Sequence, residues 1–312
     1  MRILVVGGSG FIGKNFLLKS NPYWEYFATY CNSIDFPSFL ESNNLRHVTP
    51  IHVNLTNLAD AKKIVRETGT NFDVCLYAMG NSDIGKSTKD PIVDIHFNVI
   101  PLLNLLKTIY VKKFIFISSG SVYEGYKGLV NPSLPVNPTI PYSVSKLTSE
   151  RYIAHFQRNT DHIDNYLCLR FFGAYGPMEP TRKIYSNLIK TFVVDKKHKY
   201  ILNGDGKNYI DAMYIDDAIE GILKMINSDK GNKILDYCVG QPLTINELVY
   251  SAAKALDTQI ILDHASSTPE YTTFYASPFE VEALFGFTPQ ISLEDGLQRF
   301  AKYLTQETIC QN

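Results

Sequence analysis

The sequence predicts an α/β fold in which a doubly wound parallel sheet is joined to a smaller C-terminal domain. Two observations carry this prediction. Short apolar runs rich in β-branched residues alternate with segments of helical periodicity through the first half of the chain, which is typical of a parallel sheet covered by helices on both faces. The first such run, Ile3-Leu4-Val5-Val6, also leads directly into a glycine-rich stretch that ends at Gly13.

The glycine-rich stretch is typical of a phosphate-binding turn. Gly7, Gly10 and Gly13 fit the pattern G-x-x-G-x-x-G, and a G-x-G-x-x-G pattern overlaps it. Phe11 and Ile12 open a segment of helical apolar spacing, so the stretch joins a strand to a helix. The free N–H groups and positive dipole end of such a helix attract an anion, and glycines let a diphosphate come close. We therefore expect a dinucleotide site on a Rossmann-type sheet; the alternative is a glycine turn without a ligand.

The bulk properties exclude several other classes of protein. The 312 residues carry a formal net charge of −1, which gives no global field that favours nucleic acid or an anionic membrane. No apolar run approaches the roughly 20 residues that a membrane-spanning helix needs, and no close His/Cys cluster suggests a metal site. The five cysteines form no C-x-x-C pair, and Cys75, Cys168 and Cys238 lie in apolar runs, which indicates a reducing, cytoplasmic setting.

The expected elements alternate regularly up to residue 156. They are a helix from the glycine stretch to about Lys19, strands at 25–30, 52–55, 74–78 and 114–117, helices at 58–67 and 91–106, and a helix from Tyr142 through Phe156. A helix at 216–225 and a strand near Leu235 return to the same sheet. We expect a dinucleotide-binding domain at 1–169, rejoined by about 212–238, and a substrate-binding domain formed by 170–211 and 239–312.

The end of the second strand bears on cofactor choice. An Asp or Glu about 20 residues beyond the glycine stretch usually accepts hydrogen bonds from the adenosine ribose. Cys31 stands there, followed by Asn32, so the usual signature of NAD is absent. No Arg stands there either, and Lys14 or Arg46 would have to meet the extra phosphate of NADP. The choice between NAD and NADP stays open.

Two further stretches carry the chemistry. Ser119 follows the strand at 114–117, at the sheet edge where ligands bind in open α/β folds. Tyr142 and Lys146 are four residues apart, which places them on one helix face. A nearby ammonium favours the ionised form of a phenol whose ordinary pKa is about 10, so Tyr142 can act as a base. Ser119 would hold the substrate oxygen. The alternative is that Tyr142 and Lys146 merely begin a surface helix.

The order of these motifs resembles the extended short-chain dehydrogenase/reductase family, in its NAD-dependent epimerase/dehydratase group acting on nucleotide sugars. The resemblance spans nearly the whole chain and also includes Asn98, the stretch from Arg170 to Pro177, Gly204-Asp205-Gly206 and the stretch from Tyr214 to Asp217. It implies that Ser119, Tyr142 and Lys146 are the catalytic residues. It implies cofactor contacts, with NAD or NADP, from Gly7, Gly10, Phe11, Ile12, Gly13, Cys31, Asn32, Asn54, Leu55, Ala78, Gly80, Asn98, Tyr142 and Lys146. It also implies a homodimer joined through the helices that carry Tyr142 and Asn98.

The sequence departs from the family in its substrate half. Dehydratases of the family carry an Asp-Glu pair where this chain has Gly120 and Ser121, so dehydration is not expected. Family members often have Asn at Gly173, Arg at Ile210 and another Arg within 269–275; all three are absent. Each lost contact to a diphosphate costs about 1.5–3 kcal/mol unless it is replaced. The substrate therefore carries less negative charge or is held by other residues, and we expect contacts from Ser121, Gly173, Arg182, Lys183 and Lys207; Arg182 could equally be a surface charge.

The expected activity is NAD(P)-dependent hydride transfer at a sugar carbon. The first hypothesis is a nucleotide-sugar 4-epimerase acting through a 4-keto intermediate. The alternative is an NADPH-dependent 4-keto-sugar reductase, or a 4-dehydrogenase, on a nucleotide sugar. A more distant alternative is a non-catalytic NAD(P)-binding sensor, against which the presence of Ser119, Tyr142 and Lys146 together argues.

Overall fold

The computed structural model describes residues 1–266 and 272–311, and the side chains of Ser266 and of residues 307–311 are left out of the description. The chain divides into two compact units. The first unit comprises Met1–Glu124, Pro135–Phe171 and Met225–Asp236, and the second comprises Gly125–Leu134, Phe172–Lys224 and the residues from Tyr237 onward.

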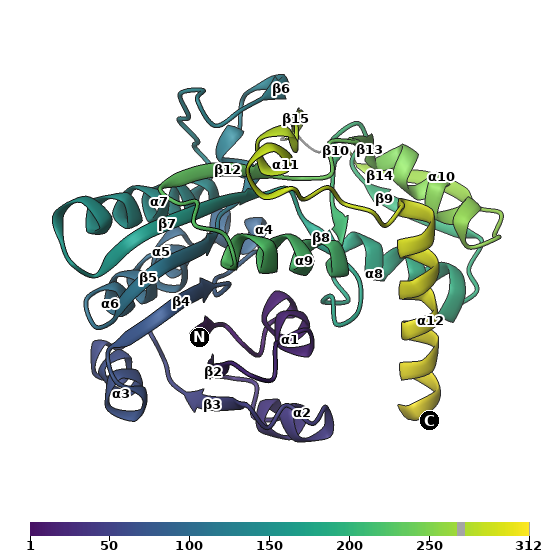
Figure 1. The fold of residues 1–312 in the computed structure, drawn as a ribbon. Helices are drawn as coiled ribbons and strands as arrows, with labels where there is room; N and C mark the ends of the chain where they lie inside the picture. Colours follow the sequence, from purple (N-terminus) through teal and green to yellow (C-terminus); the bar gives the residue numbers. More distant parts are fainter. Residues whose placement is uncertain (267–271, 312) are drawn as a thin grey trace. The chain divides into compact units, whose positions relative to one another are not determined.

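The first unit is built on a seven-stranded sheet of order β12-β7-β5-β4-β1-β2-β3 (Figure 1). The strands are β1 (Arg2–Val6), β2 (Glu25–Tyr30), β3 (Val48–His52), β4 (Asn71–Tyr77), β5 (Tyr110–Ile117), β7 (Ile163–Phe171) and β12 (Lys233–Tyr237). All six strands from β7 to β3 pair in parallel. The chain runs outward from β1 to β3 and then crosses to β4, so the topological switch point lies between β1 and β4. The doubly wound parallel sheet predicted from the sequence is confirmed.

Helices cover this sheet. They are α1 (Phe11–Leu18), α2 (Phe36–Ser42), α3 (Leu58–Thr68), α4 (Ile84–Lys89), α5 (Pro91–Asn98), α6 (Ile100–Leu106) and α7 (Pro141–Asn159), with the short helix η1 (Gly120–Tyr123) after β5. Helices α5, α6 and α7 contact one another and lie side by side in Figure 1. The apolar side chains of β4, β5 and β7 pack with those of α3, α6 and α7 in one continuous core. Burial of this core is the main stabilising contribution to the unit.

Several of the expected elements differ in their bounds. β4 begins at Asn71 rather than at 74, and β5 begins at Tyr110 rather than at 114. The third strand is Val48–His52 rather than 52–55, since β3 pairs with β2 only as far as Tyr30 and tolerates Pro50 at the sheet edge. The single helix expected at 91–106 is two helices that meet at Val99. Pro101 lies in the first turn of α6, where its missing N–H cannot continue the preceding helix.

A buried ion pair ties α7 to the sheet. Arg170 of β7 donates from Nε and Nη2 to the two carboxylate oxygens of Glu150, at 3.2 and 3.0 Å, and Ser118 Oγ donates to the same carboxylate at 2.5 Å. The guanidinium also lies over the Tyr123 ring, 4.9 Å from its centroid. Because Glu150 lies one helical turn after Lys146, this pair helps to fix the part of α7 that carries the chemistry.

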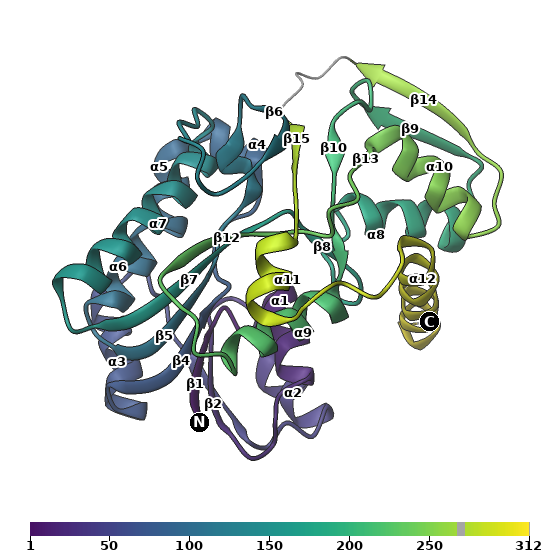
Figure 2. The same ribbon diagram turned by 45° about the horizontal axis from the view of Figure 1, so that its top comes forward.

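The second unit contains four two-stranded sheets. β6 (Lys127–Val130) pairs with β15 (Thr273–Ala276), β8 (Ala174–Tyr175) with β11 (Met213–Tyr214), β9 (Lys199–Asn203) with β14 (Ile261–Ser266), and β10 (Tyr209–Ile210) with β13 (Leu243–Thr244). Its helices are α8 (Ile184–Ile189), the π-helix η2 (Lys190–Val194), α9 (Ile215–Ile226), α10 (Ile245–Ala255), α11 (Phe279–Phe285) and α12 (Leu293–Gln311). Helix α12 packs against α8 and α10, and Figure 2 shows β9 beside β14.

The unit boundaries differ from the expected domain boundaries at two points. Residues 125–134 belong to the second unit because β6 pairs with β15. Most of α9 also belongs there, although we expected 212–238 to rejoin the first domain. Asp217 of α9 accepts hydrogen bonds from the backbone N–H groups of Gln290 and Ile291, and the Tyr237 hydroxyl donates to the carbonyl of Ala218.

We predict that Glu150→Gln lowers the free energy of unfolding by about 3–5 kcal/mol, because it leaves the buried Arg170 charge without its partner. Urea denaturation measures the loss. Glu67→Gln is the matched control: it removes an exposed pair with Lys63 at 3.6 Å, and should cost about 0.5 kcal/mol or less. Equal losses in the two variants would contradict a stabilising role for the buried pair.

Candidate active site

The glycine-rich loop joins β1 to α1 as expected. Gly7 has a φ of +84°, and a Cβ on Gly13 would lie 2.3 Å from the carbonyl oxygen of Gly7, so no larger residue fits at Gly13. Gly10 is the N-cap of α1, and within the described residues no side chain caps this helix. The first-turn N–H groups, on Phe11 and Ile12, therefore face outward without a side-chain acceptor. This loop fits a dinucleotide diphosphate.

The expected cofactor residues gather at one edge of the sheet. Each follows the carboxyl end of a parallel strand: the glycine loop follows β1, Cys31 and Asn32 follow β2, Asn54 and Leu55 follow β3, and Ala78 and Gly80 follow β4. Cys31 is tied to the next strand, since its carbonyl oxygen lies 3.0 Å from His52 Nε2. Lys14, on α1, lies 3.8 Å from Asp35 at the start of α2. Contact of each residue with a cofactor stays a prediction.

Ser119 and Tyr142 are brought together at the same edge. Ser119 lies two residues after the end of β5 and is the N-cap of η1, and its Oγ accepts a hydrogen bond from the N–H of Ser121 at 3.1 Å. Tyr142 lies in the first turn of α7, 8% exposed, and its hydroxyl shares a hydrogen bond with that of Ser119. Burial raises the pKa of Tyr142, and the bond to Ser119 opposes this rise.

Lys146 lies one turn further along α7. Its ammonium is 5.8 Å from the centroid of the Tyr142 ring and 4.9 Å from that of Phe116, and it donates to the carbonyl of Ile117 at 2.9 Å. Burial lowers the pKa of Lys146 to about 8, against the negative charges of Asp94 and Glu150, which raise it. The predicted set Ser119, Tyr142 and Lys146 is thus assembled around one point of the sheet edge.

Asn98, the last residue of α5, lies beside Gly80. Its Oδ1 accepts the N–H of Asn81 at 2.8 Å, and its Nδ2 donates to Asp94 Oδ1 at 2.8 Å. Gly80 has a φ of +150°, and a Cβ there would lie 2.6 Å from Asn98 Oδ1 and 3.6 Å from Lys146 Nζ. Asn98 was expected from the family resemblance. Asp94 and Asn81 were not, although the spacing of Asp94 four residues before Asn98 on an apolar helix is a signal that could have identified it.

This arrangement can move a proton between Tyr142 and a bound alcohol or ketone oxygen. Ser119 can hold that oxygen by a hydrogen bond, and the positive charge of Lys146 favours the tyrosinate form of Tyr142. Among the described residues, no group of three or more His, Cys, Asp or Glu side chains could hold a metal ion. None of the helices within 1–266 and 272–311 is long and apolar enough to cross a membrane.

The expected substrate contacts lie in both units. In the first unit, the Ser121 Oγ is buried and has no hydrogen-bond partner in the described chain. In the second unit, Gly173 has a φ of +124° between β7 and β8, and Lys207 lies 3.3 Å from Asp205 in its own turn. These contacts stay predictions, and residues 269–271 of the segment that lacks the usual Arg lie outside the described residues.

Arg182 and Lys183 lie in the loop that leads into α8. This loop is held by Glu179, whose Oε2 accepts hydrogen bonds from the N–H and the hydroxyl of Ser186, both at 2.8 Å. Burial raises the pKa of Glu179 to about 7, and the charge of Lys183 opposes the rise. The loop therefore has a defined anchor beside its two basic residues, whose contact with substrate stays a prediction.

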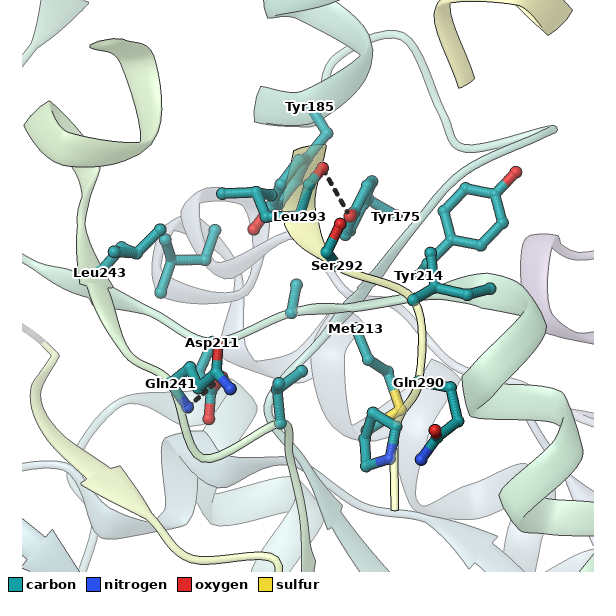
Figure 3. Close-up of a pocket in the computed structure, with 15 residues that line it drawn as sticks. Tyr175, Tyr185, Asp211, Met213, Tyr214, Gln241, Leu243, Gln290, Ser292 and Leu293 are labelled. Atoms are coloured by element: carbon teal, nitrogen blue, oxygen red, sulfur yellow. Dashed lines mark hydrogen bonds between the residues drawn. The ribbon is translucent and has the colours of Figure 1, made fainter. Parts of the chain in front are cut away.

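A separate cavity of about 280 Å³ lies wholly within the second unit (Figure 3). Tyr175 and Tyr185 stack at one end with ring centroids 4.2 Å apart. Asp211 lines it too, but its carboxylate already accepts the N–H groups of Gly240 and Gln241, at 2.9 and 3.3 Å. The described residues that line this cavity include no Lys or Arg, so it does not suit a diphosphate.

The fold and the glycine-rich loop define a dinucleotide-dependent enzyme of the short-chain type. The chain belongs to the NAD dependent epimerase/dehydratase family, whose model matches residues 3–240. A putative UDP-glucose 4-epimerase of Methanocaldococcus jannaschii is 26% identical over 316 residues, covering 97% of this chain and 98% of that protein.

Solved structures agree with this assignment. UDP-glucuronic acid 4-epimerase from Bacillus cereus, in complex with UDP-glucuronic acid and NAD, matches with a TM-score of 0.86 and 25% identity over 98% of this chain and 100% of that one. The protein RMD from Pseudomonas aeruginosa, in complex with NADPH, shares the fold at a TM-score of 0.81 and 20% identity, over 98% and 99% of the two chains. The first of these structures contains NAD, which supports the expected cofactor class, and the second shows the same fold.

We predict an alkaline limb in the pH profile of kcat/KM near pH 8. Lys146 is charged below its lowered pKa of about 8 and becomes neutral as the pH rises through that value, so its support for the Tyr142 tyrosinate is lost there. The rate constant should then fall about tenfold per pH unit. In Lys146→Arg the guanidinium stays charged. The alkaline limb of kcat/KM should therefore disappear in this variant, even if its kcat/KM is lower than that of the native protein. An unchanged plateau to pH 10 in the native protein would contradict this role.

Proposed function

We propose that this chain is a nucleotide-sugar 4-epimerase acting through a 4-keto intermediate. The observation that carries the proposal is the hydrogen bond between Ser119 and Tyr142 with Lys146 beside it, at the sheet edge where the glycine loop opens. Two relatives support it, the putative UDP-glucose 4-epimerase and the enzyme that binds UDP-glucuronic acid and NAD. We therefore infer a UDP-sugar or a related nucleotide sugar as the substrate class.

In the proposed reaction, Tyr142 accepts the proton of the sugar C4 hydroxyl while Ser119 holds the same oxygen by a hydrogen bond. Lys146 stabilises the charge on Tyr142 and lies where Gly80 leaves room, which suits contact with a ribose hydroxyl. A bound NAD-type dinucleotide would supply the nicotinamide that takes a hydride from C4 and, once the 4-keto sugar has turned over in the site, returns it to the other face of that carbon. Tyr142 then gives its proton back to the oxygen. Gly120 and Ser121 offer no acid or base for dehydration.

A reductase is the second candidate, and one observation favours it. Tyr30, Cys31, Asn32 and Ser33 offer thiol, hydroxyl and amide groups at the end of β2 but no carboxylate to repel the extra phosphate of NADPH. Mass spectrometry of the molecules released by denaturing the purified protein separates the two candidates. NAD or NADH released in stoichiometric amount supports the epimerase, and an empty protein that prefers NADPH to NADH supports the reductase.

We also propose a cytoplasmic location. Cys75 and Cys168 are buried free thiols in the structure. Free thiols of this kind persist in reducing compartments.

We predict that Tyr142→Phe lowers kcat at least about 10³-fold while leaving dinucleotide affinity within about threefold, because it removes only the proton acceptor. Activity is followed by NMR of the sugar products and affinity by titration calorimetry. Tyr152→Phe, an exposed tyrosine on the same helix, is the control and should keep native activity. Full activity of the Tyr142 variant would exclude the proposed mechanism.

We propose in addition that the protein is a homodimer joined through α5 and α7. These helices contact each other and expose large apolar side chains: Ile92, Val93, Ile95 and Phe97 on α5 and Val144 and Tyr152 on α7. Ile92 alone is 80% exposed. Exposed large apolar side chains on two helices in contact are typical of a subunit interface.

We predict that the double variant Ile92→Asp and Phe97→Glu is a folded monomer, because it places charges in the apolar interface. Light scattering after size exclusion gives the mass, against about twice the 35.3 kDa of the chain for the native protein. Ile34→Asp and Tyr23→Glu, at exposed apolar positions outside these helices, form the control pair and should leave the dimer intact. A native protein that is monomeric at micromolar concentration would refute the interface.

A further inference from the structure

Asp94 is a buried carboxylate that the proposed mechanism does not use. It lies on α5 and is 0% exposed. Its Oδ1 accepts the amide of Asn98 at 2.8 Å and that of Asn81 at 3.4 Å, while its Oδ2 accepts no hydrogen bond from any described residue. A buried carboxylate with one oxygen lacking a hydrogen bond destabilises the folded state unless an opposite charge lies near it.

The opposite charge near Asp94 belongs to Lys146. The negative charge of Asp94 raises the pKa of Lys146 against the lowering by burial, and it adds to the effect of burial in raising the pKa of Tyr142. The charged and titratable groups that act at this point come from α5, with Asp94, and from α7, with Tyr142, Lys146 and Glu150. Glu150 is itself held by Arg170 of β7, which leaves Asp94 as the carboxylate without a cationic hydrogen-bond partner.

The hydrogen bonds of Asn98 also determine the orientation of its carboxamide group. A carboxylate can only accept, so the amide nitrogen of Asn98 must point to Asp94 and its oxygen to the N–H of Asn81. With this orientation, Asn98 Oδ1 and Lys146 Nζ converge on the same space beside Gly80, the space that a Cβ would fill. The opposite orientation would place an amide oxygen against the carboxylate and an amide nitrogen against the N–H of Asn81.

We propose that Asp94 is a positioning residue of this site: it fixes the orientation of the Asn98 carboxamide and supplies the buried negative charge that balances Lys146 beneath Tyr142. This inference rests on the proposed function, because it concerns the same three side chains. It assigns to Asp94 an effect on the charge state of the site as well as on its geometry.

The first test is Asp94→Asn, which can still accept from the Asn98 amide through its Oδ1 but carries no charge. Loss of the negative charge lowers the pKa of Lys146, so the alkaline limb of the kcat/KM profile should move to lower pH, by about half a unit or more. Asp90→Asn is the matched control. Asp90 is the exposed N-cap of α5, and its side chain accepts a hydrogen bond from the N–H of Val93. Asn caps a helix equally well, so the kcat/KM profile of this variant should match that of the native protein.

The second test needs no turnover and so stands apart from the proposed function. It is a thermal-unfolding cycle of Asp94→Asn, Lys146→Met and the double variant. If the two charges balance each other, each single variant leaves one buried charge unpaired and lowers the melting temperature. The double variant should then lose less than the sum of the two single decreases in melting temperature. An unmoved pH profile together with additive losses would overturn the proposal. A coupled cycle in a protein that turns over no nucleotide sugar would retain the pairing and reject the proposed function.

Discussion

The parallel alignment of the central strands is the constraint on which the site depends. Because β1, β4 and β5 run in one direction, their carboxyl ends meet at one edge of the sheet. Each end is followed by a different part of the candidate site. The glycine loop follows β1, Gly80 follows β4 and Ser119 follows β5. The helix α7 then brings Tyr142 and Lys146 to the same edge. No single segment carries the site, so the sheet must form before the site exists.

Burial of the charged side chains at this sheet edge shifts their pKa values and also costs folding free energy. Lys146 and Arg170 are both almost fully buried cations, and the fold treats them differently. Arg170 is paired with Glu150 through two hydrogen bonds, which suits a structural link between α7 and the sheet. Lys146 has a backbone carbonyl as its hydrogen-bond partner and Asp94 only as a nearby charge. That looser arrangement keeps its pKa close to neutral pH and leaves its ammonium able to engage another hydroxyl.

Much of the first unit could be predicted from the sequence, since its elements have strong local signals. The apolar run before Gly7 and the Tyr142–Lys146 spacing depend on neighbours in the chain, and both predictions correspond to the observed β1 and α7. The break at Val99 was missed because the helical apolar spacing continues across Pro101. The role of β6 in the second unit depends on β15, about 145 residues later, and no local pattern specifies such a pairing. The contact of Asp94 with Asn98 has a local signal in their four-residue spacing, but the effect of its charge on Lys146 depends on a residue remote in sequence.

The substrate half was predictable only as a departure from the family pattern. The sequence offers Arg182, Lys183 and Lys207 as candidates to replace the absent residues, or else a substrate with less negative charge. Pocket shape depends on side-chain packing that a single chain does not encode locally. The structure adds that Lys207 is already paired with Asp205, which reduces the charge it can offer to a diphosphate. Arg182 and Lys183 lie in the loop held by Glu179 and Ser186, and their contact with a diphosphate stays a proposal.

The most direct measurement of the central claim follows a hydrogen at the sugar carbon. UDP-glucuronic acid or UDP-glucose deuterated at C4 is incubated with the protein in ordinary water, and the products are analysed by NMR. An epimerase that removes a hydride from C4 and returns it to the same carbon predicts the 4-epimer with its deuterium retained. A 4-epimer that has exchanged its deuterium for solvent hydrogen, or 4-keto product released without epimer, would contradict the account.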